Sequence, residues 1–134
     1  MHWGFVRTTD SFYLAPSFDH ASSMGCRLRQ DEKRNRLDTK DAGYTVEAFA
    51  KKAKTAMYKN DKILKTYCLA NLCHKYYREE YSFWVEEINA IPVEFITRCF
   101  EGLPKDWAND IDKEFTIQRL QENKRELNSL CVKN

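Results

Sequence analysis

The sequence lacks a long apolar run, and it lacks a strong charge of either sign. No stretch approaches the roughly 18–20 apolar residues that a membrane-spanning helix needs, so we expect no membrane partner. The 134 residues carry 22 basic and 20 acidic side chains, a net charge of +2. Such a balance gives no overall electrostatic reason to expect direct nucleic-acid binding, although it leaves room for local patches.

A secretory leader and a disulfide framework are also missing. The first ten residues, MHWGFVRTTD, have no basic region followed by an apolar stretch, so we expect no signal peptide. The five cysteines are an odd number at irregular spacing, and three of them stand within apolar helical patterns. This usage predicts reduced, mostly buried thiols and a cytoplasmic location.

The composition that remains is that of a folded domain. Hydrophobic residues make up 43% of the chain and aromatic residues 13%, and the length allows one domain with its own core. The patterning changes near Gly43 from a period of two to a helical period. We therefore expect a mainly α fold with a short N-terminal β-hairpin (α+β). Residues 1–43 would hold the hairpin, a loop and a linker, and residues 44–134 a helical lobe.

The expected elements follow from local signals. The hairpin would pair residues 3–7 with residues 12–15, and Pro16 would end its second strand. A short charged helix is expected over residues 31–37. About five helices are expected in the rest of the chain. They would begin near Thr45, Asp61, Ser82, Pro92 and Lys113.

An isolated two-stranded hairpin is marginally stable in water, so this one needs a cover. Its alternate residues Trp3, Phe5, Phe12 and Leu14 would share one apolar face. Exposed strand edges pair with other chains. We therefore expect a homodimer, or a complex with a partner chain, that uses residues 3–15.

One block of sequence resembles the HipA-like serine/threonine kinases. Members of that family carry an Asp-Arg-His-x-x-Asn catalytic loop, then a Trp-Gly strand, then a second strand that ends in Leu-Ala-Pro-x-Phe-Asp-His-x-Ser-Ser-x-Gly. The corresponding residues here are Trp3-Gly4-Phe5-Val6 and Leu14-Ala15-Pro16-Ser17-Phe18-Asp19-His20-Ala21-Ser22-Ser23-Met24-Gly25. The helical remainder is similar only in pattern, through Ile91-Pro92, Leu103-Pro104 and Asn123-Lys124-Arg125-Glu126-Leu127.

The resemblance implies the C-terminal lobe of a kinase fold with an ATP site between two lobes. It implies that Asp19 corresponds to the aspartate that binds Mg²⁺ at the end of the second strand. A carboxylate fixed at a strand end suits a hard cation that bridges ATP phosphates. The other interpretation is that Asp19 caps the loop over residues 17–25.

The departures from the family pattern concern catalysis. The Asp-Arg-His segment would stand just before residue 1, and His2 takes the place of the metal-binding asparagine. A Gly-rich loop and an ATP-contacting lysine are not recognisable either. We therefore expect no catalytic residue in this sequence and no normal binding of ATP or Mg²⁺ by these residues alone.

Other candidate residues have simpler interpretations. Ser22 and Ser23 could contact phosphate or be phosphorylated, but turn residues are the simpler assignment, and His20 could support the metal site or lie on the surface. Cys68, Cys73 and His74 do not share a helix face, so we expect no metal there. Two further groups are expected to form a solvated helix face and a core with a partly wet edge. They are the basic cluster Arg27, Arg29, Lys33, Arg34 and Arg36, and the aromatic group Tyr76, Tyr77, Tyr81, Phe83 and Trp84.

Two functions follow as hypotheses. The first is the C-terminal lobe of a HipA-like kinase of the toxin–antitoxin type, inactive by itself as an ATP:protein phosphotransferase. The second is a non-catalytic interaction module that binds a chain carrying the N-terminal lobe, or an antitoxin.

Overall fold

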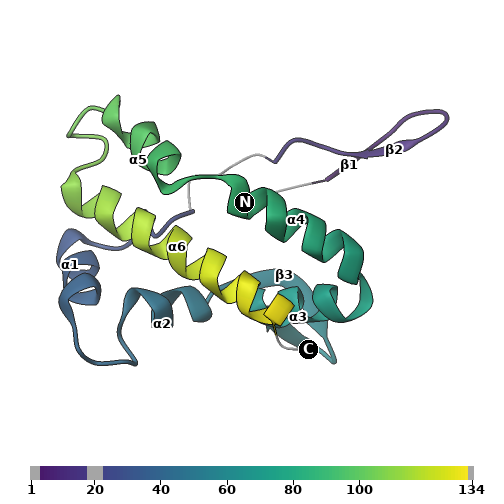
Figure 1. Ribbon diagram of the computed structural model, residues 1–134, viewed down its shortest axis with the longest axis horizontal. Helices are drawn as coiled ribbons and strands as arrows, with labels where there is room; N and C mark the ends of the chain where they lie inside the picture. Colours follow the sequence, from purple (N-terminus) through teal and green to yellow (C-terminus); the bar gives the residue numbers. More distant parts are fainter. Residues whose placement is uncertain (1–3, 18–22, 133–134) are drawn as a thin grey trace.

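The computed structural model describes residues 4–17 and 23–132. Two β-hairpins and six helices follow one another along these residues (Figure 1). They are β1 (Phe5–Arg7), β2 (Phe12–Leu14), α1 (Gln30–Asp38), α2 (Val46–Lys51), β3 (Lys54–Lys59), β4 (Lys62–Lys65), α3 (Thr66–Tyr76), α4 (Arg78–Ala90), α5 (Val93–Glu101) and α6 (Asp110–Val132). The expected mainly helical fold with a short N-terminal hairpin is confirmed, as are five helices after Gly43.

Helix α6 is the centre of the helical part. It contacts each of the other five helices and runs diagonally across them in Figure 1. Phe115 on α6 and Val46 on α2 are fully buried. The Phe115 ring meets Phe49 edge to face, with the ring centroids 5.7 Å apart. The core therefore forms along α6, where α1 and α2 pack on it.

The second hairpin, β3–β4, replaces the start of a predicted helix. We expected a helix from Asp61 through Ile63 and Leu64, and this prediction is wrong because residues 62–65 form a strand. Asn60 and Asp61 form the turn with positive φ angles of 50° and 60°, a left-handed conformation that Asn and Asp tolerate in two-residue hairpin turns. Helix α3 begins only at Thr66.

Several helix ends agree with their signals. The Thr45 hydroxyl accepts a hydrogen bond from the Ala48 N–H at 3.2 Å, which caps α2 as expected. Pro92 stands before α5 and Gly102 after it. The other two helices begin earlier than expected. Helix α4 starts at Arg78 instead of Ser82, directly after the single residue Tyr77, and α6 starts at Asp110 instead of Lys113.

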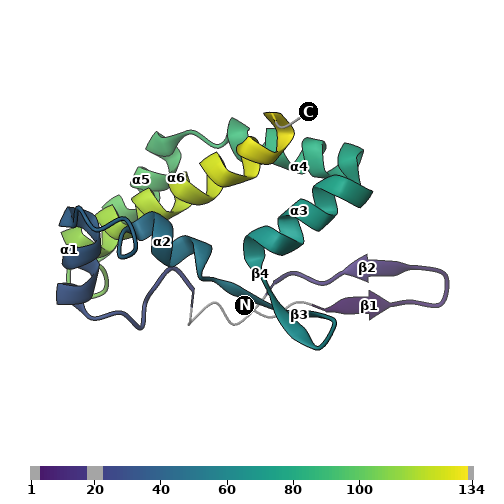
Figure 2. The ribbon, with the colours of Figure 1, turned by 90° about the horizontal axis from the view of Figure 1, so that it is seen from below.

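The N-terminal hairpin projects away from the helices (Figure 2). Its register pairs Phe5 with Leu14 and Arg7 with Phe12, which places Phe5, Phe12 and Leu14 on one face. These three side chains are 67%, 68% and 67% exposed. The expected apolar face is therefore present and largely exposed in these residues, while Trp3 lies outside the described part of the chain.

The chain exposes more surface than a compact protein of its size. Its accessible surface is 10093 Å² for a mass of 15.9 kDa. A compact monomer of that mass exposes roughly 7,400 Å². In the described residues, eighteen large hydrophobic side chains are exposed and only six hydrophobic residues are buried. The fold therefore holds a small core and leaves much apolar surface exposed.

Candidate functional site

The loop that ends the block of residues 14–25 is anchored to α6. Met24 and Gly25 both have positive φ angles, 54° and 74°. The loop closes through backbone hydrogen bonds from Cys26 N–H to the Ser23 carbonyl at 3.2 Å and from Leu28 N–H to the Gly25 carbonyl at 2.9 Å. A β-carbon on Gly25 would stand 2.8 Å from Cε1 of Phe115. The last residue of the block thus has a packing role that only glycine fills.

The metal-site prediction falls on residues that are not described. Asp19, His20 and Ser22 lie within residues 18–22, and His2 lies within residues 1–3, so all four are outside the described residues. Within residues 4–17 and 23–132, the structure holds no group of three His, Cys, Asp or Glu side chains positioned for a metal ion. The Mg²⁺ assignment of Asp19 therefore stays a prediction.

An apolar groove of about 400 Å³ lies beside the anchored loop. Met24, the end of α4, one side of α5 and the middle of α6 form it. Its apolar lining includes Met24, Ile88, Ile91, Phe95, Ile96, Phe100 and Leu120. Lys124 stands at its edge, and its Nζ donates to the carbonyls of Asn89 at 2.9 Å and Ile91 at 3.0 Å. This lysine is engaged at the end of α4, so the groove suits an apolar side chain better than a charged ligand.

A polar hollow on the other side of the loop contains a salt bridge between α1 and α6. Lys33 Nζ lies 2.5 Å from Asp112 Oδ1, and only 6% of the Lys33 side chain is exposed. Gln30 donates to both carboxylate oxygens of Asp112, and the Asn109 N–H donates to one of them. The carboxylate is thus fully hydrogen-bonded, which suits a structural link better than a ligand site.

Burial acts to raise the pKa of Asp112, but the hydrogen bonds outweigh it. The donors are Lys33, Gln30 and the Asn109 backbone, and together they bring the pKa below its ordinary value.

We predicted that the basic cluster forms a solvated helix face. This prediction is wrong for Lys33, which is only 5% exposed. The start of α6 could have been recognised from an Asn109-x-x-Asp112 capping pattern, in which each side chain accepts a hydrogen bond from the other's backbone N–H.

A second member of the basic cluster, Arg36, stacks on aromatic rings. Its guanidinium carbon lies 4.1 Å from the Tyr44 ring centroid and 4.9 Å from that of Phe49. Arg119 of α6 lies 5.1 Å from the same Phe49 ring. The Arg36 Nη1 also donates to the Tyr44 carbonyl at 3.2 Å. These contacts fasten α1 and α2 to α6 and hold both charges in packing roles.

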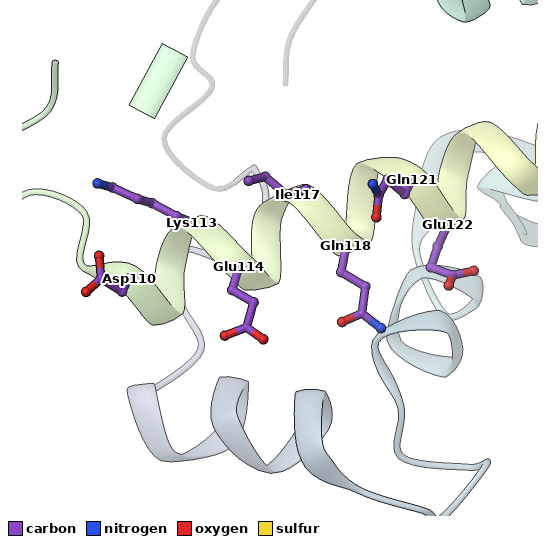
Figure 3. Close-up of a pocket in the computed structure, with 7 residues that line it drawn as sticks. All are labelled: Asp110, Lys113, Glu114, Ile117, Gln118, Gln121 and Glu122. Carbon is purple, nitrogen blue, oxygen red and sulfur yellow. The ribbon is translucent and has the colours of Figure 1, made fainter. Parts of the chain in front are cut away.

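A broad hollow of about 610 Å³ lies along α6. Figure 3 shows the side chains that line it. Its lining comes from that helix alone, and the side chains fan out from it without pointing at a common centre. Glu114 pairs with Arg34 of α1 at 3.3 Å, and Glu122 pairs with Arg125. A catalytic site needs convergent groups, so this hollow is a charged helix surface.

The cysteine prediction needs a correction. Cys26, Cys68 and Cys99 are exposed, and Cys73 and Cys131 are half-buried, so the expectation of mostly buried thiols is wrong. Helical periodicity suggested burial for three of the five, but periodicity does not show whether another element covers that helix face. His74 packs edge to face against Tyr81 at 5.3 Å, in a packing contact.

The aromatic group at the end of α3 and in α4 divides as expected into core and edge. Tyr81 is buried, and its hydroxyl donates to the Leu127 carbonyl at 2.9 Å. Burial raises its pKa to about 12. Tyr76, Tyr77, Phe83 and Trp84 are exposed.

Comparison with known proteins adds no assignment. No protein family matches the chain, and it has no significant match among curated proteins or solved structures. No helix among the described residues is long and apolar enough to cross a membrane. The features that stand out in the described part of the chain are exposed surfaces, among them two hairpins and the apolar groove beside Met24.

Proposed function

We propose that these 134 residues form the C-terminal helical lobe of a HipA-like kinase fold and that they bind the rest of that fold. The observation that carries this proposal is the excess of exposed surface. It amounts to roughly 2,700 Å² above that of a compact monomer. A standard protein interface takes about 800 Å² from each partner, so the excess is enough for an extensive interface.

The kinase assignment rests on the block that runs from Leu14 to Gly25. By this resemblance, the missing lobe would normally cover the apolar face of the hairpin. The exposed side chains of Phe12 and Leu14 fit a hairpin whose cover is another part of a kinase. The close packing of Gly25 on Phe115 supports this assignment, because it joins the last residue of the block to the helical core.

The proposal includes no phosphoryl transfer by these residues alone. Catalysis of that reaction depends on positioning and on charge stabilisation by an aspartate and metal ions. The sequence has no Asp-Arg-His segment, and His2 stands where the family has its metal-binding asparagine. Asp19 would then contribute one Mg²⁺ ligand to a site that another part of the kinase completes.

A reconstitution experiment tests this function. The purified chain is mixed with a HipA-like kinase truncated just before its Trp-Gly strand, and turnover of radiolabelled ATP with Mg²⁺ is measured. We expect no turnover by either part alone and turnover by the mixture. Asp19→Ala should abolish it, whereas Asp10→Ala, in the exposed hairpin turn, should leave it unchanged.

Two results would contradict the proposal. One is ATP turnover by the pure chain that disappears in Asp19→Ala. The other is failure of the two parts to form a complex when titrated together in a calorimeter.

The same exposed surface favours a second candidate, a non-catalytic module that binds a partner chain or an antitoxin. The two candidates differ in the reconstitution experiment. A complex that forms without gaining ATP turnover, and that Asp19→Ala does not alter, would favour the non-catalytic module.

A further inference from the structure

The β3–β4 hairpin is the most basic part of the chain. Residues 51–65 hold six lysines and a single aspartate, a net charge of +5, whereas the whole chain carries +2. The remainder of the protein is therefore slightly acidic. The whole-chain balance, from which we expected no nucleic-acid contact, conceals this segment.

Four of these lysines face one another in pairs. The strand register places Lys54 directly opposite Lys65, and Lys59 directly opposite Lys62. Like charges in directly opposed positions destabilise a strand pair. Lys51 is neutralised by Glu47 at 2.7 Å and Glu126 at 3.4 Å. In the described part of the chain, none of the four opposed lysines has a carboxylate within ion-pair distance.

Protection of a strand edge does not account for this arrangement. Single lysines on an edge suffice to discourage pairing with other chains. Here the pairs repel each other across the ribbon, and the side chains between them remain apolar and open. Tyr58 is 65% exposed, Ile63 is 43% exposed and Met57 is 40% exposed. Positive charge without acidic partners, next to exposed apolar side chains, is typical of a surface that binds a polyanion.

The pairs also lie on different faces of the ribbon. Residues 63 and 65 share one face of β4, so Lys54, Lys65, Tyr58 and Ile63 point one way, and Lys59 and Lys62 point the other. The strand rises about 10 Å from residue 62 to residue 65. A flat anionic membrane would meet one face only. A nucleic-acid groove has phosphates on both sides and is wide enough for a two-stranded ribbon.

We propose that the β3–β4 ribbon binds the phosphodiester backbone of a nucleic acid, with Lys54, Lys65, Lys59 and Lys62 contacting phosphates. Tyr58 and Ile63 then lie against bases or sugars between those contacts. The register shifts between Lys54 and Tyr58, and such an irregularity commonly increases the local twist of a ribbon, which suits a helical groove. This binding is independent of the kinase assignment.

The test is fluorescence anisotropy with labelled duplex DNA and single-stranded RNA over a range of KCl concentrations. Each phosphate contact contributes about 0.9 to the slope of log K against log salt for duplex DNA. Changing all four opposed lysines to Gln should weaken binding at least about tenfold at low salt and lower that slope by about 3.6.

The control variant removes the same number of positive charges from positions outside the hairpin. Gln in place of Lys40, Lys75, Lys105 and Lys113 gives the same net charge and should keep both affinity and slope. Circular dichroism should show the same helix content in both variants. The proposal is overturned if the wild-type chain binds neither nucleic acid, if both variants lose binding equally, or if the chain binds only anionic lipid vesicles or acidic peptides.

Discussion

Gly25 and the ring of Phe115 are in such close contact that residue 25 has no room for a side chain. A β-carbon there would stand 2.8 Å from Phe115 Cε1 and 3.5 Å from Leu28 Cδ1. Phe115 itself is fully buried. The end of the N-terminal loop and the centre of α6 are thus fixed to each other, which ties the most distinctive block of sequence to the helical core.

Gly25→Ala should destabilise the protein by about 2–4 kcal/mol, because it adds both a left-handed backbone cost and a clash with Phe115. Urea unfolding followed by circular dichroism measures this change. The control is Gly102→Ala, since a β-carbon there meets nothing within 4 Å and the φ angle is −85°. Equal stability of the two variants would contradict the packing role of Gly25.

Asp112→Ala should lower the free energy of unfolding by about 2–4 kcal/mol, because it leaves the Lys33 ammonium buried without a partner. Asp31→Ala removes an exposed partner of Arg29 and should cost less than about 1 kcal/mol. Thermal and urea unfolding of both variants would check the difference. A small loss for Asp112→Ala would show that the salt bridge is not needed.

Stability should fall in acid because of the same carboxylate. The pKa of Asp112 is lower in the folded protein than its ordinary value, about 3.9 in an unfolded chain. Its contribution is present above that value and is lost as the pH falls through the folded pKa. The free energy of unfolding of Asp112→Asn should therefore change less with pH below about 4 than that of the wild type. Parallel curves for the two proteins would contradict this assignment.

The N-terminal hairpin should mediate association. We expect the wild-type chain to sediment as a dimer at high micromolar concentration, since Phe12 and Leu14 are about two thirds exposed on one face. Phe12→Ser with Leu14→Ser should give a monomer. The control pair, Tyr76→Ser with Phe83→Ser, removes comparable exposed apolar groups from α3 and α4 and should stay dimeric. A wild-type monomer at that concentration would count against the hairpin as an interface.

The sequence predicts much of this fold where one local signal acts alone. Thr45, Pro92 and Gly102 mark helix ends correctly because capping and proline chemistry depend on the neighbouring backbone only. The β3–β4 hairpin escapes prediction because Ile63, Leu64, Tyr67 and Cys68 have helical spacing across a strand–helix boundary. Periodicity alone does not separate this strand from the helix. The hairpin becomes apparent only from the left-handed turn at Asn60 and Asp61.

The residues of the candidate sites could likewise be predicted only where the signal is local. The exposed set in the N-terminal hairpin follows from strand alternation, so Phe5, Phe12 and Leu14 could be named in advance. The burial of Lys33 depends on Asp112, which is 79 residues away in the sequence. The opposed lysine pairs depend on the register of a hairpin that the pattern does not reveal.

Helix α6 also determines when this protein can fold during synthesis. It packs on all five other helices, yet it follows every one of them in the sequence, so the ribosome releases it after they have emerged. Until then, the earlier helices, including those that carry the buried Val46 and Val85, lack the packing surface of α6. Each nascent chain therefore spends the translation time of α6 with its apolar helix faces open, and this interval is when chaperones have most to bind.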